Sequence, residues 1–243
     1  TGDYILSDAY LSVIEALQFS GAAIGAKPKI DWINAKEFQN GEGVEKLAQY
    51  DGIIVPGGFG ETGIEGKIHA IKFARENKIP YFGLCYGMQL AVIEVARHVL
   101  GIKEAHTVEI NPTTAHPIVD VMPEQKDLIA EGNYGGTMRL GVYTAELGKG
   151  TIAREAYGKD KVEERHRHRY EINPEYIEQI EKGGIVFSGK SPDGVLMEIA
   201  ELSQDVHPFF LGTQFHPELK ARPLSPHPLF TAFLKAAKTR AKK

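Results

Sequence analysis

The sequence has 243 residues, of which 42% are hydrophobic, and a formal net charge of −4 at pH 7. This length allows one large domain or two small ones, and the negative charge gives no electrostatic reason to expect a nucleic-acid partner. No apolar run is long enough to span a bilayer and no export signal opens the sequence, so we expect no membrane partner. The single cysteine, Cys85, excludes an internal disulfide and suits a reducing environment, so we expect a cytoplasmic location.

The first hundred residues alternate between predicted helices and predicted strands. Ser7-Asp8 predicts the cap of a helix that ends near Gly21. Hydrophobic periodicity predicts strands over 29–33, 52–55 and 79–82, and helices over 44–50, 65–77 and 88–100. This alternation indicates βαβ units, so we predict an α/β fold with a central, mostly parallel sheet and helices on both faces. Ligands of such sheets bind beyond the carboxyl ends of the strands.

The predicted elements change in character after residue 100. Residues 104–134 are rich in Pro, Thr and His and are expected to form loops with short strands. We predict antiparallel strands over 137–144 and 161–171, further strands over 185–187, 195–200 and 209–215, and a last helix over 228–238. Asn173-Pro174-Glu175 predicts a helix start. No repeat or linker interrupts the chain, so we predict a single domain over 1–243 with a smaller antiparallel region.

Cys85 stands between a predicted strand and a predicted helix, with Gly83 and Gly87 two positions away on either side. This pattern is typical of a nucleophile elbow, a turn so sharp that side chains at these two positions would collide. The start of the helix adds partial positive charge, which favours a thiolate. A lone cysteine is more often a buried structural residue, but this setting favours a nucleophile.

A cysteine nucleophile needs a base, and His216 is the strongest candidate among nine histidines because it follows an apolar strand. Glu218 projects on roughly the same side of an extended chain, where its carboxylate can fix the imidazole tautomer. The alternative is a turn histidine beside an incidental glutamate. The backbone N–H groups of Gly57-Gly58 and Tyr86 can form an oxyanion hole, although Pro-Gly-Gly also fits an ordinary turn.

Two further stretches allow more than one interpretation. Residues 184–191 spell the phosphate-loop pattern GxxxxGKS, but a β-branched and aromatic run followed by a Pro-Asp-Gly turn predicts a strand instead. Residues 165–171 hold three arginines and two histidines. The alternating pattern places the arginine side chains on one face of a strand. They then either bind a carboxylate or phosphate, or face solvent on an edge strand. Neighbouring cations oppose a metal ion, so we expect no metal site.

Three of these stretches, 56–60, 83–89 and 215–218, resemble the signatures of triad-type (class I) glutamine amidotransferases. Residues 8–17, 135–141 and 165–171 are more specific and resemble the glutaminase domain of CTP synthases, a similarity that runs along nearly the whole chain. The resemblance implies a domain that hydrolyses L-glutamine and passes ammonia to a separate synthetase domain. That domain aminates ATP-activated UTP to CTP.

The resemblance also implies roles for individual residues. It makes Cys85 the nucleophile, His216 the base and Glu218 its orienter. Gly58 and Tyr86 would supply the oxyanion-hole amides, and Tyr86, which stands where the family commonly has leucine, would contribute through its backbone. Three further positions match residues that hold the substrate: Gln89, Glu109 and Arg169. A carboxylate suits the α-ammonium group of glutamine, and a guanidinium suits its α-carboxylate.

The sequence departs from the family in three respects. The family usually begins with an apolar strand before the glycine that matches Gly2, so either that strand lies upstream or the sheet is built differently. Thr62 stands where arginine is usual in a loop linked to GTP activation, so GTP is only a candidate effector. No synthetase domain or ATP site is found. We therefore expect no cofactor in this domain, and ATP and Mg²⁺ only in the absent one.

Two other functions fit parts of the pattern. The chain can be the glutaminase of another synthetase, such as GMP synthase, although 135–141 and 165–171 argue against this. It can also be a regulatory module that keeps the fold without catalysis, although the intact set of Cys85, His216 and Glu218 argues against that. The expected partners are L-glutamine and a CTP synthase synthetase domain, in the same parent chain or a separate one.

Overall fold

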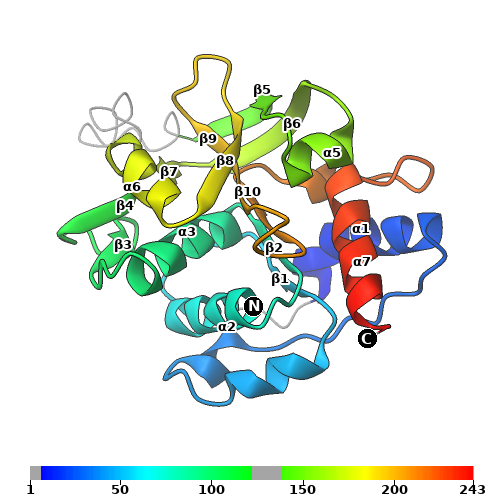
Figure 1. Ribbon diagram of the computed structural model, residues 1–243, viewed down its shortest axis with the longest axis horizontal. Helices are drawn as coiled ribbons and strands as arrows, with labels where there is room; N and C mark the ends of the chain where they lie inside the picture. The colour runs from blue at the N-terminus through cyan, green and yellow to red at the C-terminus, as the bar shows by residue number, and fades with distance from the viewer. Residues whose placement is uncertain (1–6, 122–137, 243) are drawn as a thin grey trace.

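A seven-stranded sheet runs through the centre of the computed structural model, which describes residues 7–121 and 138–242 (Figure 1). Its strands lie in the order β1 (Ile53–Val55), β2 (Tyr81–Leu84), β10 (Phe210–Thr213), β9 (Met197–Leu202), β8 (Ile185–Lys190), β5 (Arg139–Leu147) and β6 (Lys161–His168). A second sheet has the order β3 (Ala105–Thr107), β4 (His116–Val121) and β7 (Tyr170–Ile172).

The predicted α/β fold is confirmed, but the central sheet is less parallel than we expected. Among the described strands, β1–β2 and β2–β10 pair in parallel, whereas β10–β9, β9–β8, β8–β5 and β5–β6 pair antiparallel. Helix α2 (Ile64–Glu76) connects β1 to β2, as a parallel crossover requires. A short turn joins β8 to β9, and so short a connection permits only an antiparallel pair.

Helices cover both faces of the central sheet (Figure 1). Helices α2, α3 (Tyr86–His98) and α6 (Ile177–Lys182) contribute to the core on one face. Helices α1 (Leu11–Ala23), α5 (Ile152–Tyr157) and α7 (Pro228–Arg240) contribute to the core on the other. Residues 86–96 of α3 are all buried, which makes α3 the most enclosed of these helices.

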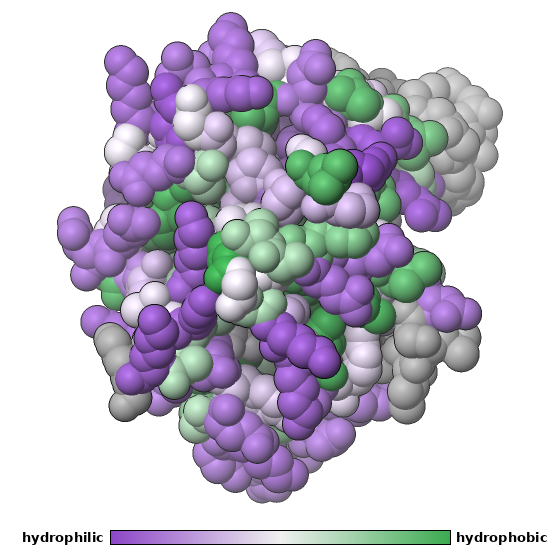
Figure 2. All heavy atoms as spheres, turned by 90° about the vertical axis from the view of Figure 1, so that its right-hand side faces the viewer, coloured by the Kyte–Doolittle hydropathy of each residue, from purple (hydrophilic) through white to green (hydrophobic). Residues whose placement is uncertain are grey.

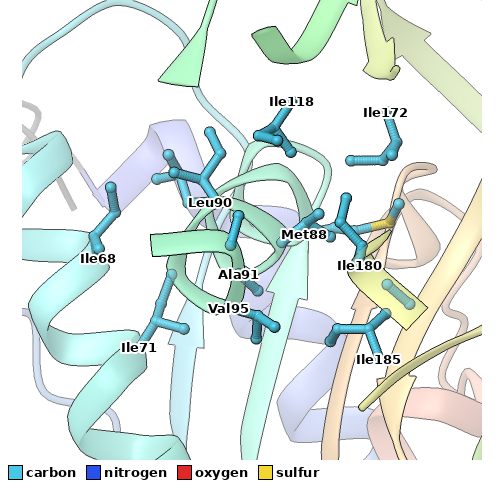
Figure 3. Close-up of a cluster of buried hydrophobic side chains, with 14 of the residues drawn as sticks. Ile68, Ile71, Met88, Leu90, Ala91, Val95, Ile118, Ile172, Ile180 and Ile185 are labelled. Atoms are coloured by element: carbon cyan, nitrogen blue, oxygen red, sulfur yellow. The ribbon is translucent and has the colours of Figure 1, made fainter. Parts of the chain in front are cut away.

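Figure 3 shows how α3 is enclosed by apolar side chains. Leu90 and Val95 point into a cluster that Ile68 enters from α2 and Ile118 from β4. Because α3 is held from several sides, its first turn has a fixed position relative to the ends of the strands.

Several 3₁₀ turns complete the described chain: η1 (Ser7–Tyr10), η2 (Ala35–Phe38), η3 (Val44–Gln49), η5 (Pro174–Tyr176) and η6 (Pro217–Leu219). The helix predicted over 44–50 is therefore a 3₁₀ helix, and η1 precedes α1 where a capped α-helix start was expected. The predicted cap at Asn173 is confirmed, since its side chain accepts the N–H of Glu175. The pattern at 184–191 is confirmed as a strand and turn, because β8 occupies most of it.

The strand predicted over 29–33 is wrong. These residues form no strand in the described chain, and they line a cavity of about 570 Å³ beside β1, together with Leu17 of α1 and Phe233 of α7. The predictions for a first strand and for residues 122–137 concern positions outside the described residues. No described helix is both long and apolar enough to cross a bilayer. The side of the molecule in Figure 2 is mainly hydrophilic, with apolar side chains in small groups.

Candidate active site

The three parallel strands end at the same level of the sheet. Val55 of β1 pairs with Gly83, and Leu84 of β2 pairs with Thr213 of β10. The chain leaves these strands as the loop 56–60, as Cys85 and as the segment that contains His216. The sheet therefore brings together the three stretches that the sequence analysis singled out.

Cys85 occupies a strained turn between β2 and α3. Its φ is 49° and its ψ is −98°, a conformation that residues with a side chain rarely adopt. The N–H group of Cys85 donates to the carbonyl of Thr213 at 2.6 Å, and the residue is only 6% exposed. Such strain costs about 1–3 kcal/mol and persists only where the surroundings enforce it.

The glycines on either side of Cys85 are required by close backbone contacts. A Cβ on Gly83 would lie 2.6 Å from the carbonyl carbon of Gly87. A Cβ on Gly87 would lie 2.2 Å from the carbonyl oxygen of Val55. Both distances are well below van der Waals contact, so the first turn of α3 packs directly onto β1 and β2 through its backbone.

Gly87→Ala is expected to lower the free energy of unfolding by about 1–3 kcal/mol, the usual cost of forcing an atom into a packed site. Chemical denaturation measures this loss. Gly148→Ala is the matched control, because a Cβ at Gly148 meets no atom closer than 3.5 Å. Equal stabilities for the two variants would contradict the packing described here.

His216 and Glu218 form a hydrogen-bonded pair next to Cys85. The Nδ1 atom of His216 lies 2.7 Å from Oε1 of Glu218, and the N–H group of His216 donates to the carbonyl of Arg165 at 2.8 Å. Burial alone would lower the pKa of His216, but hydrogen bonds and charge from Cys85 and Glu218 raise this pKa to about 10. The imidazole is therefore cationic at neutral pH.

The loop after β1 lies against these residues. A Cβ on Gly57 would come within 2.8 Å of Cε1 of His216, so this loop approaches the imidazole closely. Gly58 lies next to the ring of Tyr86, whose hydroxyl donates to the carbonyl of Gly60 at 2.9 Å. The loop and the first residue of α3 are thus fixed to each other.

Glu109 and Arg169 are neighbours on another side of this loop. Oε1 of Glu109 accepts the N–H of Gly60 at 2.9 Å. Burial raises the pKa of Glu109, while the Gly60 N–H and the charge of Arg169 oppose this rise. An acidic and a basic side chain therefore lie within electrostatic reach of each other beside the loop.

Gln89 and Gln214 connect α3 to the end of β10. The Nε2 group of Gln89 donates to the carbonyl of Tyr170 at 2.9 Å and to Oε1 of Gln214 at 3.1 Å. The Nε2 group of Gln214 lies 3.6 Å from Sγ of Cys85. The sequence analysis missed Gln214, although a polar residue in the apolar run 209–215 was a signal that could have revealed it.

The two faces of β6 differ sharply. Arg165 and Arg167 are exposed on one face, as alternation predicted, and anion binding there stays a prediction. His166 and His168 are buried on the other face. They belong to a buried polar cluster that the sequence analysis also missed, whose other members are Arg139, Glu171 and Glu198. The alternating pattern of 161–168 placed the histidines inward, but not their partners.

Within the described ranges 7–121 and 138–242, no three His, Cys, Asp or Glu side chains are grouped so that they could hold a metal ion. The part of the chain that carries the GxxxxGKS pattern runs as β8 into a turn, in which the N–H of Gly194 donates to the carbonyl of Ser191. It therefore lacks the loop at a helix start that cradles phosphates.

A sequence profile of the glutamine amidotransferase class-I family matches residues 5–236, and the chain belongs to this family. Within the family it is similar to CTP synthases. It is 55% identical to the CTP synthase of Shouchella clausii over 237 residues, which cover 97% of this chain and 43% of that protein. It is 54% identical to the CTP synthase of Bacillus subtilis, with the same coverage.

A solved structure gives the same result. The glutaminase domain of Trypanosoma brucei CTPS with bound acivicin superposes with a TM-score of 0.90 and 34% identity, covering 98% of this chain and 92% of that one. The chain spans less than half the length of the curated relatives named above. It therefore corresponds to their glutamine amidotransferase part.

Proposed function

We propose that this chain hydrolyses L-glutamine by thiol acyl transfer, with Cys85 as nucleophile, His216 as base and acid, and Glu218 as the residue that orients the imidazole. The observation that carries the proposal is that Cys85, His216 and Glu218 lie together just beyond the ends of the parallel strands. A buried cysteine in a strained turn contributes to the raised pKa of a neighbouring imidazole, whose Nδ1 lies 2.7 Å from a carboxylate. This is the arrangement that activates a nucleophile in a triad.

The reaction takes two steps. The Cys85 sulfur attacks the carboxamide carbon of glutamine, and the C–N bond breaks as the cationic His216 gives a proton to the leaving ammonia. Water then attacks the thioester and gives a proton to His216, and the C–S bond breaks, which releases glutamate and restores the Cys85 thiolate and the cationic imidazole. The N–H groups of Gly58 and Tyr86 would stabilise the oxyanion in both steps, because backbone donors fixed in advance need no reorganisation.

Free glutamine can be held by its α-amino-acid group. Glu109 would pair with the α-ammonium and Arg169 with the α-carboxylate, and Gln89 would contribute a further polar contact. The proximity of Glu109 and Arg169 beside the loop 56–60 supports this assignment, since glutamine would then extend its amide toward Cys85.

The ammonia is proposed to serve the amination of UTP to CTP in a synthetase domain, which would bind ATP and Mg²⁺. Identity of 54–55% to CTP synthases over 97% of the chain favours this role over the glutaminase of GMP synthase. The complete set of Cys85, His216 and Glu218 argues against a regulatory module without catalysis. GTP is proposed only as a candidate effector, because Thr62 departs from the family pattern. We propose a cytoplasmic location and no nucleic-acid partner.

The chain alone is expected to hydrolyse glutamine slowly and to make no CTP from UTP, ATP and ammonium. Ammonium bypasses the glutaminase, so an absorbance assay for CTP tests the synthetase reaction separately, and a coupled glutamate assay tests hydrolysis. Adding a matching synthetase domain should raise hydrolysis and yield CTP from glutamine. CTP formed by the chain alone would show that it carries a nucleotide site, and no glutamate with either preparation would refute the glutaminase.

A further inference from the structure

Gln214 lies beside the sulfur of Cys85 and is completely buried. Its backbone is fixed at the end of β10, where its N–H group donates to the carbonyl of Glu198 at 2.8 Å. Its side-chain Nε2 is 3.6 Å from Sγ of Cys85, a normal length for a hydrogen bond to sulfur. The glutaminase mechanism proposed above assigns no function to the contact between Gln214 and the sulfur of Cys85.

The orientation of the Gln214 amide follows from its neighbours. The side-chain group of Gln89 that faces the carbonyl of Tyr170 must be its NH₂, since a carbonyl only accepts. The same NH₂ also faces Gln214 at 3.1 Å, so Gln214 must present its oxygen there. The NH₂ of Gln214 then points at the sulfur. A reversed Gln214 amide would place its NH₂ against the NH₂ of Gln89 and its oxygen against the sulfur, so that neither contact pairs a donor with an acceptor.

A series of buried polar groups next to Tyr170 supports this orientation of the Gln214 amide. The carbonyl of Tyr170 also lies 3.3 Å from Nδ1 of His168, which must therefore carry a proton. Burial lowers the pKa of His168 to about 3 and that of His166 to about 2, so both rings are neutral. Nε2 of His168 then accepts from Nδ1 of His166 at 2.9 Å. Nε2 of His166 is an acceptor that faces Oε2 of Glu198 at 3.5 Å.

Glu198 is the last group in this series. Its Oε1 accepts from Arg139 at 2.7 Å, while its Oε2 and Nε2 of His166 have no other hydrogen-bond partner in the described structure. Burial raises the pKa of Glu198 to about 7, although Arg139 opposes the rise. A proton on Oε2 would satisfy both orphaned atoms. Nη1 of Arg139 also lies 3.5 Å from Nδ1 of His166, a long contact that stays unmade in this order, so the orientation of the Gln214 amide rests on Gln89 and Tyr170.

We propose that Gln214 is a further catalytic residue, which donates a hydrogen bond to the thiolate of Cys85. Gln89 and the carbonyl of Tyr170 position it, backed by His168, His166 and Glu198. This inference rests on the proposed function, in which Cys85 reacts as a thiolate. The cationic His216 stabilises the sulfur on one side, and Gln214 provides a second donor from the end of β10. A hydrogen bond to a charged group changes an equilibrium by about tenfold or more.

The test uses the fact that Cys85 is the only cysteine. Alkylation of the chain by iodoacetamide, followed by mass spectrometry from pH 5 to 10, reports the thiolate of Cys85 directly. In Gln214→Met, which keeps the side-chain size and removes the donor, we expect alkylation to be about tenfold slower at neutral pH, as the loss of one charged hydrogen bond implies. The profile should move to higher pH, and kcat for glutamine should fall while KM changes little.

The variant and the unmodified chain share the other titratable and charged groups near the sulfur and near its supporting residues, so a difference between their profiles reports Gln214 alone. These shared groups are His216, Glu218, His168, Glu171, Glu198 and Arg139. Gln179→Met is the matched control, since Gln179 is exposed on α6 and should leave the profile unchanged. If Gln214→Met does not fold, Gln214→Leu carries the same test. It also lacks a donor, so its profile should move to higher pH as well.

A folded Gln214 variant whose alkylation profile coincides with that of the unmodified chain would overturn the proposal. A shifted profile supports the hydrogen bond, whatever the activity. If the unmodified chain shows the expected alkylation and yet never hydrolyses glutamine, with or without a synthetase domain, the proposed function fails while the contact between Gln214 and Cys85 stands.

Discussion

Cys85→Ala is expected to abolish glutamine hydrolysis while leaving the fold intact. Loss of a nucleophile from a catalytic unit costs up to about 10⁶-fold in kcat. The fold should survive because alanine removes only one sulfur atom, and the backbone turn is held by the packing of Gly83 and Gly87 and by the bond from Cys85 N–H to Thr213.

The coupled glutamate assay measures the loss of turnover, and circular dichroism with thermal denaturation checks the fold. Gly148→Ala serves again as a control for the substitution itself. Residual turnover within tenfold of the unmodified chain would show that another group attacks the carboxamide, and Cys85 would then be a structural residue.

His216→Ala is expected to lower kcat by about 10³–10⁵-fold, because the chain loses the group that stabilises the thiolate and protonates the leaving ammonia. His98→Ala is a suitable control. His98 is the last residue of α3, about 20 Å from the first turn by the rise of a helix, and should leave turnover unchanged. Near-normal turnover in His216→Ala would refute the assignment of His216.

Glu218→Gln should have a smaller effect that depends on pH. Glu218 helps raise the pKa of His216 to about 10, so its charge favours the cationic imidazole. Removing that charge lowers the pKa of His216. Activity that needs the imidazolium should then be lost at a lower pH than in the unmodified chain. The alkaline limb of the pH–rate profile measures this shift, and an unchanged limb would show that Glu218 does not act through His216.

The sequence predicted the elbow well because its determinants are local. The strand before Cys85, the glycines at 83 and 87 and the first turn of the helix all lie within residues 81–89. Helices α1, α2, α3 and α7 were predicted for the same reason, whereas the six-residue α5 was not predicted. The parallel part of the sheet followed from the alternation of strands and helices before residue 100.

The errors concern partners that lie far apart in the chain. Residues 29–33 have a strand-like composition, but a strand needs a neighbour to pair with, and local sequence does not supply one. The antiparallel half of the sheet depends on which strands pair next to β10. Gln214 was missed because its contact to Cys85 spans 129 positions. The inward histidines of β6 were visible from alternation, but Arg139 and Glu198 reach them from other strands.

The central claim is that Cys85 attacks the side-chain amide of a bound glutamine. Incubation with a glutamine-like electrophile, followed by peptide mapping, tests it most directly. The account predicts one covalent adduct, on the peptide that contains Cys85, whose formation slows in the presence of excess glutamine and disappears in Cys85→Ala. An adduct on another residue, or labelling of Cys85 that glutamine does not slow, would contradict it.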